Sequence, residues 1–180
     1  MECDPETWTQ GNFEDKSDAE NRAYLEGVFS EDLDGSPLLS NKSEWSNFRV
    51  VKNKHWSHEN VVLLGDASHT AHFSIGSGTK LALEDAIALY RAFADHPRAS
   101  VPDVLAAFEE ARKPLVDRLQ TAAQQSLEWF ETVKERIDLH PMAFAYELMT
   151  RSGRIDHDKL RTRDPAFYAA YQAYRESSGD

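Results

Sequence analysis

The chain has 180 residues, of which 41% are hydrophobic and 28% are charged, and its formal net charge is −11. This composition suffices for the core of one globular domain or of a large part of one. The acidic balance excludes non-specific binding to nucleic acid, which requires a basic surface. No apolar run approaches the length of a membrane span. The single cysteine, Cys3, excludes an internal disulfide and is typical of a protein of the reducing cytoplasm.

The first part of the chain is predicted to contain a helix followed by a turn. Ser17 is a favourable N-cap residue, and Glu20, three residues later, can complete a capping box. We therefore expect a helix near Ser17–Phe29. The run Asp34-Gly35-Ser36-Pro37 predicts a turn after it, because these residue types favour turn conformations.

An extended segment is expected over residues 45–56, which are rich in aromatic and β-branched side chains. It leads to a strand predicted at Val61–Leu64. Four consecutive apolar residues indicate a strand buried on both faces, as in a parallel sheet covered by helices. The early part of the chain has too few strands to complete such a sheet, and a buried strand without partners leaves its N–H and C=O groups unsatisfied. We therefore expect the chain to be one part of a larger fold.

The second half of the chain is predicted to be almost entirely helical. A long helix is expected from Pro102 to about Leu139, because apolar residues recur there at steps of three and four. Pro114 lies inside it and should kink it. Shorter helices are expected after Pro141 and after Asp164-Pro165. The expected fold class is α+β and predominantly helical, with few strands and one long kinked helix.

The segment Val61–Leu89 carries the most informative pattern. A Gly65-Asp66 turn follows the predicted strand, and a glycine-punctuated loop leads into a helix expected over residues 79–94. The Asp66 carboxylate can accept hydrogen bonds from hydroxyl groups. The backbone N–H groups of residues 78–80 can donate to an electron-rich oxygen or nitrogen, since they lie at the positive end of the helix dipole. The pattern predicts a site for a polar cofactor.

Three short motifs follow one another in this segment: GDA-x-H at residues 65–69, G-x-G at 76–78 and DA at 85–86. At this spacing the chain resembles the second FAD-binding motif of class A flavoprotein aromatic hydroxylases, the family typified by para-hydroxybenzoate hydroxylase. The wider sequence is similar to the salicylyl-CoA 5-hydroxylase and anthraniloyl-CoA monooxygenase branch of the family. The similar runs are MECDPETW, DLDG-x-PLLSN, WSHENVVLLGDASHTAHFSIGSGTKLALEDAIAL and SLEWFE. The likeness covers most of the chain. It implies the C-terminal portion of a para-hydroxybenzoate hydroxylase-like FAD-binding fold.

The resemblance implies that FAD is bound largely by backbone groups. The implied cofactor-binding residues are Gly65, Asp66, Gly76, Gly78, Thr79 and Lys80. Asp66 would hydrogen-bond a ribitol hydroxyl, and the amides of residues 78–80 would face the N1–C2=O edge of the isoalloxazine ring. The chemistry agrees, because a helix N-terminus stabilises the anionic N1 of reduced flavin and glycines let the backbone approach a flat ring closely.

The chain departs from the commonest family pattern at two places. It has His72-Phe73 where many members have a Pro-Pro pair, and Lys80 where many have asparagine. The first departure implies a different substrate-side surface, so His72 is a candidate for lining the substrate pocket, with ordinary packing as the alternative. Lys80 could add positive charge near N1 if its side chain points there. No catalytic acid or base is identified.

A G-x-G-x-x-G turn, which holds the pyrophosphate of a dinucleotide, does not occur in the 180 residues. The resemblance implies that the ADP half of FAD is bound by residues that would precede Met1, and that a reductase-like domain would follow Asp180. We therefore expect the C-terminal part of a hydroxylase domain. Residues 1–58 are interpreted as a remnant of the substrate-side region, 59–100 as the second FAD-binding motif and 101–180 as a C-terminal helical region.

The function that the resemblance implies is part of a cytoplasmic FAD-dependent monooxygenase. It would hydroxylate an aromatic acyl-CoA, of the salicylyl-CoA or anthraniloyl-CoA type, with NAD(P)H and O₂, and would bind neither nucleic acid nor membrane. The alternatives are a truncated, non-catalytic fragment and a helical interaction module at residues 102–175. Either of these would need a partner half to bind FAD.

The motif also allows interpretations other than a cofactor site. Asp66, His69 and His72 could suggest a metal site, but no further ligand cluster accompanies them, so no metal is expected. Ser68 beside His69 does not predict a hydrolase, because sequence neighbours rarely have nucleophile–base geometry and there is no G-x-S-x-G elbow. His69 is expected to orient the loop through a backbone hydrogen bond, and Asp85 is expected to be structural.

Overall fold

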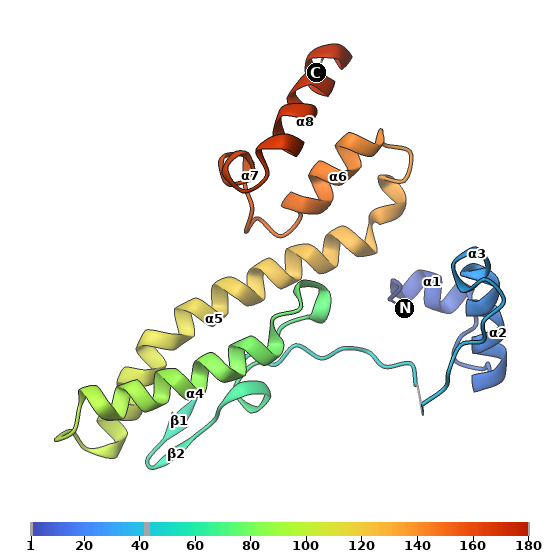
Figure 1. Cartoon of the computed structure of the whole chain (residues 1–180). Helices are drawn as coiled ribbons and strands as arrows, with labels where there is room; N and C mark the ends of the chain where they lie inside the picture. Colours follow the sequence, from blue (N-terminus) through green and yellow to red (C-terminus); the bar gives the residue numbers. More distant parts are fainter. Residues whose placement is uncertain (1, 42–43, 180) are drawn as a thin grey trace. The chain divides into compact units, whose positions relative to one another are not determined.

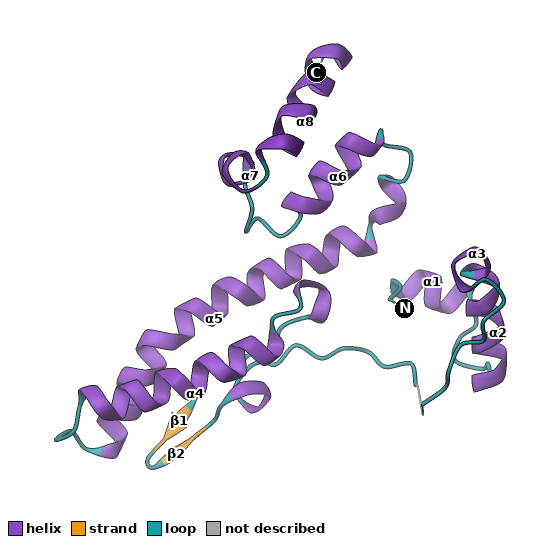
Figure 2. Ribbon diagram, viewed as in Figure 1, coloured by secondary structure: helices purple, strands orange, loops and turns teal. Residues whose placement is uncertain are grey.

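A computed structural model describes residues 2–41 and 44–179 (Figure 1). The chain divides into two compact units, Met1–Phe48 and Arg49–Asp180. Helices make up most of the described chain, and strands form only a short hairpin within it (Figure 2). The expectation of a predominantly helical fold with few strands is therefore confirmed. Within the described residues, no helix is both long and apolar enough to span a membrane.

The helices of the first unit follow from their capping residues. They are α1 (Pro5–Gln10), α2 (Asp18–Val28) and α3 (Ser30–Leu33). The predicted capping box is present: Ser17 Oγ accepts the Glu20 N–H at 3.3 Å, and the Glu20 carboxylate accepts the Ser17 N–H at 2.8 Å. The predicted turn follows α3, where Asp34 and Gly35 have φ values of 45° and 78°.

An aromatic cluster forms the interior of the first unit. Phe13 is only 2% exposed, and its ring centroid lies 5.1 Å from that of Tyr24 and 4.8 Å from that of Trp45. The Lys16 ammonium lies 4.9 Å from the centroid of the Phe13 ring and 4.7 Å from that of Tyr24. Aromatic contacts and a cation–π interaction therefore hold α2 against the segments on either side of it.

The second unit begins with a hairpin of β1 (Ser57–His58) and β2 (Val61–Val62), which pair antiparallel. The paired residues are Ser57 with Val62 and His58 with Val61. The predicted buried parallel strand at Val61–Leu64 is wrong, because β2 is short, antiparallel and leaves Val61 62% exposed. The reason is local. A two-residue turn at Glu59-Asn60 lets adjacent segments pair without the crossover that a parallel pair requires.

Helices α4 (Gly78–Asp95) and α5 (Val101–Glu131) form the body of the second unit and lie side by side (Figure 1). The helix expected at 79–94 is thus confirmed to within one residue at each end. The buried core lies between α4, α5 and the preceding loop, and consists of Trp56, Ala71, Leu81, Phe108, Val116 and Ala123. Burying these apolar side chains stabilises the packing of the loop against both helices.

Helix α5 ends earlier than the predicted 102–139 helix. It ends at Glu131, and a single 3₁₀ turn (η3, Val133–Glu135) follows. The Thr132 carbonyl accepts the Glu135 N–H at 3.0 Å, a bond one residue shorter than in an α-helix, and the Arg136 guanidinium donates to the same carbonyl at 2.9 Å and to the Thr132 hydroxyl at 2.8 Å. Pro114 lies within α5 and does not end it.

The shorter helices predicted near the C-terminus are present. They are α6 (Pro141–Thr150), α7 (His157–Arg163) and α8 (Pro165–Ser178). Stacked aromatic pairs join α6 to α8: the Tyr146 and Tyr171 rings are parallel, with centroids 4.0 Å apart. The His157 ring of α7 lies within hydrogen-bond distance of the Tyr146 and Tyr168 hydroxyls, at 3.3 Å and 2.9 Å.

Candidate cofactor site

The turn that follows β2 is a 3₁₀ turn, η1 (Gly65–Ala67), which packs against α4. Gly65 has a φ of +56°, in the left-handed region where a side chain is strained. A Cβ at this position would lie 3.1 Å from the Ala82 Cβ of α4. Glycine therefore serves here both for its backbone conformation and for the close approach of the turn to the helix.

Asp66 is exposed on this turn. Among the described residues, none donates a hydrogen bond to its carboxylate or forms an ion pair with it. The carboxylate is therefore free to accept hydrogen bonds from a ligand. This is the role that the sequence predicts for Asp66, and it stays a prediction.

The first turn of α4 carries backbone donors without partners. Ser77 occupies the N-cap position, but its side chain accepts no hydrogen bond from the first turn, and its hydroxyl donates instead to the Ile75 carbonyl at 3.2 Å. Within the described chain, the N–H groups of residues 78–80 donate no hydrogen bond. Helix N-termini normally satisfy these donors with a side-chain cap. This one leaves them available for a ligand at the positive end of the helix dipole.

The glycines of the loop leave space in front of these donors. Gly76 has a φ of +60° and ends the 3₁₀ turn η2 (Phe73–Ile75). Apart from the adjoining backbone, a Cβ on Gly76 or on Gly78 would meet no atom of the described residues within 4 Å. The start of α4 is therefore open on the side of these glycines, as a flat ring requires.

The Lys80 ammonium forms an ion pair and is not a free positive charge facing this space. Its ammonium is 2.6 Å from a carboxylate oxygen of Glu84, one turn further along α4. The hydrogen bond from Lys80, together with that from Arg112, outweighs the effect of burial and lowers the pKa of Glu84 below its usual value. The positive charge at the start of α4 is thus balanced within the helix, and the backbone amides are the free donors.

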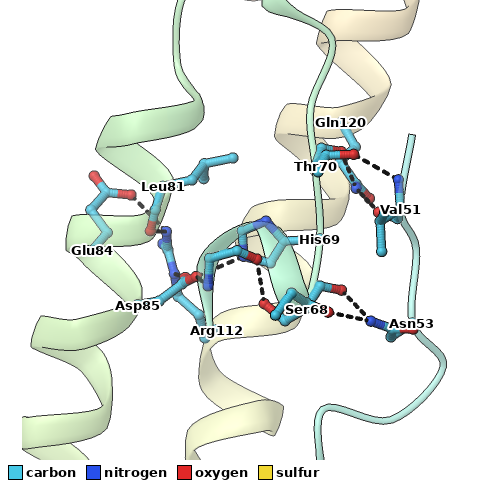
Figure 3. A network of polar contacts seen from close by, with 12 residues as sticks. Val51, Asn53, Ser68, His69, Thr70, Leu81, Glu84, Asp85, Arg112 and Gln120 are labelled. Atoms are coloured by element: carbon cyan, nitrogen blue, oxygen red, sulfur yellow. Dashed lines mark hydrogen bonds and ion pairs between the residues drawn. The ribbon is translucent and has the colours of Figure 1, made fainter. Parts of the chain in front are cut away.

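Asp85 of α4 is completely buried and holds the turn in place (Figure 3). Its Oδ2 atom accepts the Gly65 N–H at 3.1 Å and lies 2.7 Å from His69 Nε2. Its Oδ1 atom accepts the Arg112 Nε–H at 2.7 Å. Because a carboxylate between these donors acts as the acceptor, the His69 proton is assigned to Nε2. His69 Nδ1 is buried and has no hydrogen-bond partner within the described chain.

Arg112 of α5 ties this carboxylate to a second helix. Its NH2 group donates to the Leu81 carbonyl at 3.2 Å and to the Glu84 carboxylate at 2.9 Å (Figure 3). Burial alone would raise the pKa of Asp85, but the hydrogen bonds from His69 and Arg112 reverse this and lower it. Asp85 is therefore ionised, and the turn, α4 and α5 share one buried network.

The segment before the hairpin is fastened to the same loop (Figure 3). Gln120 of α5 donates to the Val51 carbonyl at 2.8 Å and to the Thr70 carbonyl at 2.7 Å. Asn53 donates to the carbonyls of Ala67 and Ser68, each at 2.9 Å. The loop that carries Asp66 is thus held from both sides.

His72 lies in the loop behind the glycines. It is 6% exposed, its Nδ1 accepts the Ser74 N–H at 3.3 Å, and its ring lies against that of Phe73, with the centroids 4.3 Å apart and the ring planes tilted by 32°. Packing of this kind is compatible with both of its predicted roles, so its place in a substrate pocket stays a prediction. Among the described residues, no group of three His, Cys, Asp or Glu side chains could hold a metal ion.

The structure brings the predicted residues to one region. The Gly65–Ala67 turn contacts α4 at Ala82 and Asp85, one and two helical turns beyond Gly78. The backbone hydrogen bond expected of His69 is present, since its N–H donates to the Gly65 carbonyl at 2.9 Å, and its ring additionally bonds the Asp85 side chain. Asp85 has the structural position expected of it.

Two residues that the sequence analysis missed are Arg112 and Gln120. Both are buried on α5, at 5% and 3% exposure. A signal was present, because positions 108, 112, 116 and 120 share one helix face, and polar residues alternate there with apolar ones. A charged or amide residue on a buried stripe must have internal partners.

The groups present fit a flavin. Within the part of the chain that the structure describes, three helix-N-terminal donors and the Asp66 carboxylate have no partner, and the glycines leave the approach to the donors open. These groups suit a ring with an electron-rich edge and a hydroxylated side chain. We call the Asp66 carboxylate and the N–H groups of residues 78–80 the cradle.

Comparison with known proteins agrees with this class of site. Residues 6–123 match the family model described as FAD binding domain. The chain is 40% identical over 177 residues to salicyloyl-CoA 5-hydroxylase of Streptomyces sp, which covers 93% of this chain and 34% of that protein. It is 44% identical over 140 residues to 3-hydroxy-4-methyl-anthranilyl-[aryl-carrier protein] 5-monooxygenase of Streptosporangium sibiricum, covering 78% and 38%.

A third relative is protodeoxyviolaceinate monooxygenase of Chromobacterium violaceum, 35% identical over 152 residues, which covers 84% of this chain and 40% of that protein. The chain belongs to the FAD-binding domain family of aromatic monooxygenases. It spans between about a third and two fifths of the length of these relatives.

Proposed function

We propose that this chain supplies the flavin-ring half of the active site of an FAD-dependent aromatic monooxygenase. The observation that carries the proposal is the uncapped start of α4, where the N–H groups of residues 78–80 have no partner within the described chain. In a family of FAD-binding domains, such donors suit the N1–C2=O edge of the ring. The exposed Asp66 carboxylate would accept a hydrogen bond from a ribitol hydroxyl.

The bound flavin would supply the redox chemistry, with NAD(P)H as reductant and O₂ as the oxygen donor. The residues of this chain would bind and orient it. The α4 amides would stabilise negative charge at N1 without a side-chain cation, because the Lys80 ammonium is already paired with Glu84. Gly76 and Gly78 would let the backbone lie close to the cofactor.

For the substrate we propose an aromatic acyl group attached to CoA, of the salicylyl or anthraniloyl type. Two relatives are named for aromatic acyl groups carried on CoA or on an aryl-carrier protein, and this supports the proposal. His72 is the residue of this chain that we propose for the substrate side. We place the protein in the cytoplasm, which the single cysteine supports.

The ADP half of FAD needs a second binding element. The 180 residues contain no G-x-G-x-x-G turn for the pyrophosphate. We therefore propose that a dinucleotide-binding half acts together with this chain, and that a reductase-like domain is a further partner. The division into residues 1–58, 59–100 and 101–180 remains our interpretation of how this part is organised.

The flavin contacts can be tested with two probes on the full chain. Riboflavin carries the ribityl hydroxyls, whereas lumiflavin has a methyl group in their place. Asp66→Ala should weaken riboflavin binding about tenfold, which equals about 1.4 kcal/mol, and should leave lumiflavin binding unchanged. Fluorescence titration measures both affinities. Asp95→Ala, which removes an exposed carboxylate at the far end of α4, is the matched control. Equal losses for both flavins, or no loss for either, would contradict the assignment.

The substrate class is tested with the flavin-loaded chain and NADH or NADPH in air. Salicylyl-CoA and anthraniloyl-CoA are compared with the corresponding free acids, and mass spectrometry detects a product heavier by one oxygen atom. Hydroxylation of a CoA thioester, but not of the corresponding free acid, supports the proposal. Bound flavin without any product favours the alternative of a non-catalytic part that needs its partner half.

A further inference from the structure

The cradle has two parts that lie on different segments of the chain. The free amides belong to the first turn of α4, whereas Asp66 lies on the turn before it. A ligand that uses both requires a fixed spacing between them. Asp66 makes no side-chain contact of its own with the described residues that could set this spacing.

The residues on either side of Asp66 are both attached to one carboxylate. Gly65 donates its N–H to Asp85 Oδ2 at 3.1 Å, and the His69 ring lies 2.7 Å from the same oxygen. The turn is also closed on itself, since the Ser68 and His69 N–H groups each donate to the Gly65 carbonyl at 2.9 Å. Asp66 thus lies in a closed turn with two anchor points on Asp85.

Asp85 and the free amides belong to the same helix. Asp85 is seven residues after Gly78, which is two helical turns, or about 10 Å of rise. Because a helix is stiff over this length, attachment at Asp85 fixes Asp66 relative to the amides. Arg112 holds the carboxylate in one orientation from α5, through a 2.7 Å bond to Oδ1. It is itself only 5% exposed and also bonds Leu81 and Glu84.

We propose that His69, Asp85 and Arg112 are positioning residues that hold the Asp66 carboxylate at a fixed distance from the free α4 amides. This inference rests on the proposed function, because the spacing matters only if one flavin uses both parts of the cradle. The network contains no group that touches the ligand. It acts through the Gly65–Ala67 turn, and it determines how well the site recognises a flavin that carries ribityl hydroxyls.

The test compares two substitutions of His69 in the full chain. Gln can place an amide N–H where His69 Nε2 lies, so His69→Gln keeps the donor to Asp85. His69→Leu fills a similar volume without a donor. Hydrogen exchange without any flavin should be about tenfold faster for the turn residues 65–70 in the Leu variant, and within about threefold of the unchanged chain in the Gln variant.

Flavin affinity gives the second readout. The Leu variant should bind riboflavin about tenfold more weakly than the Gln variant, while the two variants bind lumiflavin equally. A general loss of structure would weaken both flavins alike, so the difference between the probes identifies positioning. If the Leu variant loses its helical circular dichroism, His69→Asn replaces it, because the shorter amide cannot reach Asp85.

The outcomes separate this inference from the proposed function. Equal exchange at residues 65–70 in the Gln and donor-lacking variants overturns the positioning role, whether or not flavin binds. Equal riboflavin affinity in the two variants also overturns it. If the unchanged chain binds neither flavin, the proposed function fails, and with it the purpose of the network, although the exchange difference would still show that Asp85 anchors the turn.

Discussion

Replacing Arg112 with methionine should destabilise the second unit strongly. Arg112 donates to Asp85, Leu81 and Glu84, and it is 5% exposed while Asp85 is 0% exposed. Methionine preserves most of the volume, so the cavity contribution is small. The cost comes from a buried carboxylate that loses its cationic partner, for which about 3 to 5 kcal/mol is typical.

The free energy of unfolding is measured by urea denaturation at neutral pH, followed by far-ultraviolet circular dichroism, since the second unit carries the long helices. Arg118→Met is the matched control, because Arg118 is exposed on the same helix. The control should change the free energy of unfolding by less than about 0.5 kcal/mol. A loss below about 1 kcal/mol in Arg112→Met would refute the view that this network anchors the turn. If adding Asp85→Asn to Arg112→Met restores the free energy of unfolding, this view is supported, because the uncompensated buried charge is then removed.

Two further predictions concern the turn and the pH. Gly65→Ala should lower the free energy of unfolding by more than the roughly 1 to 2 kcal/mol of left-handed strain, because its Cβ would also lie 3.1 Å from that of Ala82. Gly35→Ala is the control, because Gly35 has a φ of +78° and a Cβ there would have nothing within 4 Å among the described residues, so this variant should show the backbone strain alone. If urea denaturation gives the same loss of unfolding free energy for both variants, the close approach of Gly65 to Ala82 is refuted. The folded-state pKa of Asp85 is lowered from its ordinary value of 3.8, so its ionisation stabilises the fold above that pH and this stability is lost as the pH falls through the folded pKa. As the pH is lowered into the acid range, the free energy of unfolding measured with urea should therefore fall more steeply for the unchanged chain than for Asp85→Asn. If the free energies of the two proteins fall in parallel with pH, this role of Asp85 is contradicted.

The local chemistry of helix ends could be predicted from the sequence. The Ser17 and Glu20 capping box and the start of α4 at the last glycine of the loop, Gly78, follow from short-range hydrogen bonding and backbone freedom. The C-terminal end of α5 could not be predicted this way. The Arg136 side chain takes the Thr132 carbonyl and hydroxyl, and an apolar periodicity does not reveal such a contact.

The buried face of α5 and the pairing of the strand at Val61 could not be predicted without tertiary information. Val116 is fully buried whereas its neighbour Leu115 is 46% exposed, because the buried stripe of α5 contains Val116 together with Arg112 and Gln120. A run of four apolar residues at Val61–Leu64 suggested a buried parallel strand, yet its partner is the adjacent segment of a hairpin. The cradle residues were identifiable because glycine, aspartate and a helix start have local signatures. The network that holds them was not, because it joins residues up to 47 positions apart, Gly65 to Arg112.

The most direct test of the cradle is the NMR spectrum of the backbone amides of the full chain during titration with riboflavin. We predict that the amide signals of Gly78, Thr79 and Lys80 shift most, since their N–H groups would form new hydrogen bonds to the ring, while those of Gly27 and Gly153 stay in place. Saturating binding that leaves the signals of residues 78–80 unshifted, or that shifts another surface instead, would contradict the central claim that the uncapped start of α4 binds the flavin ring.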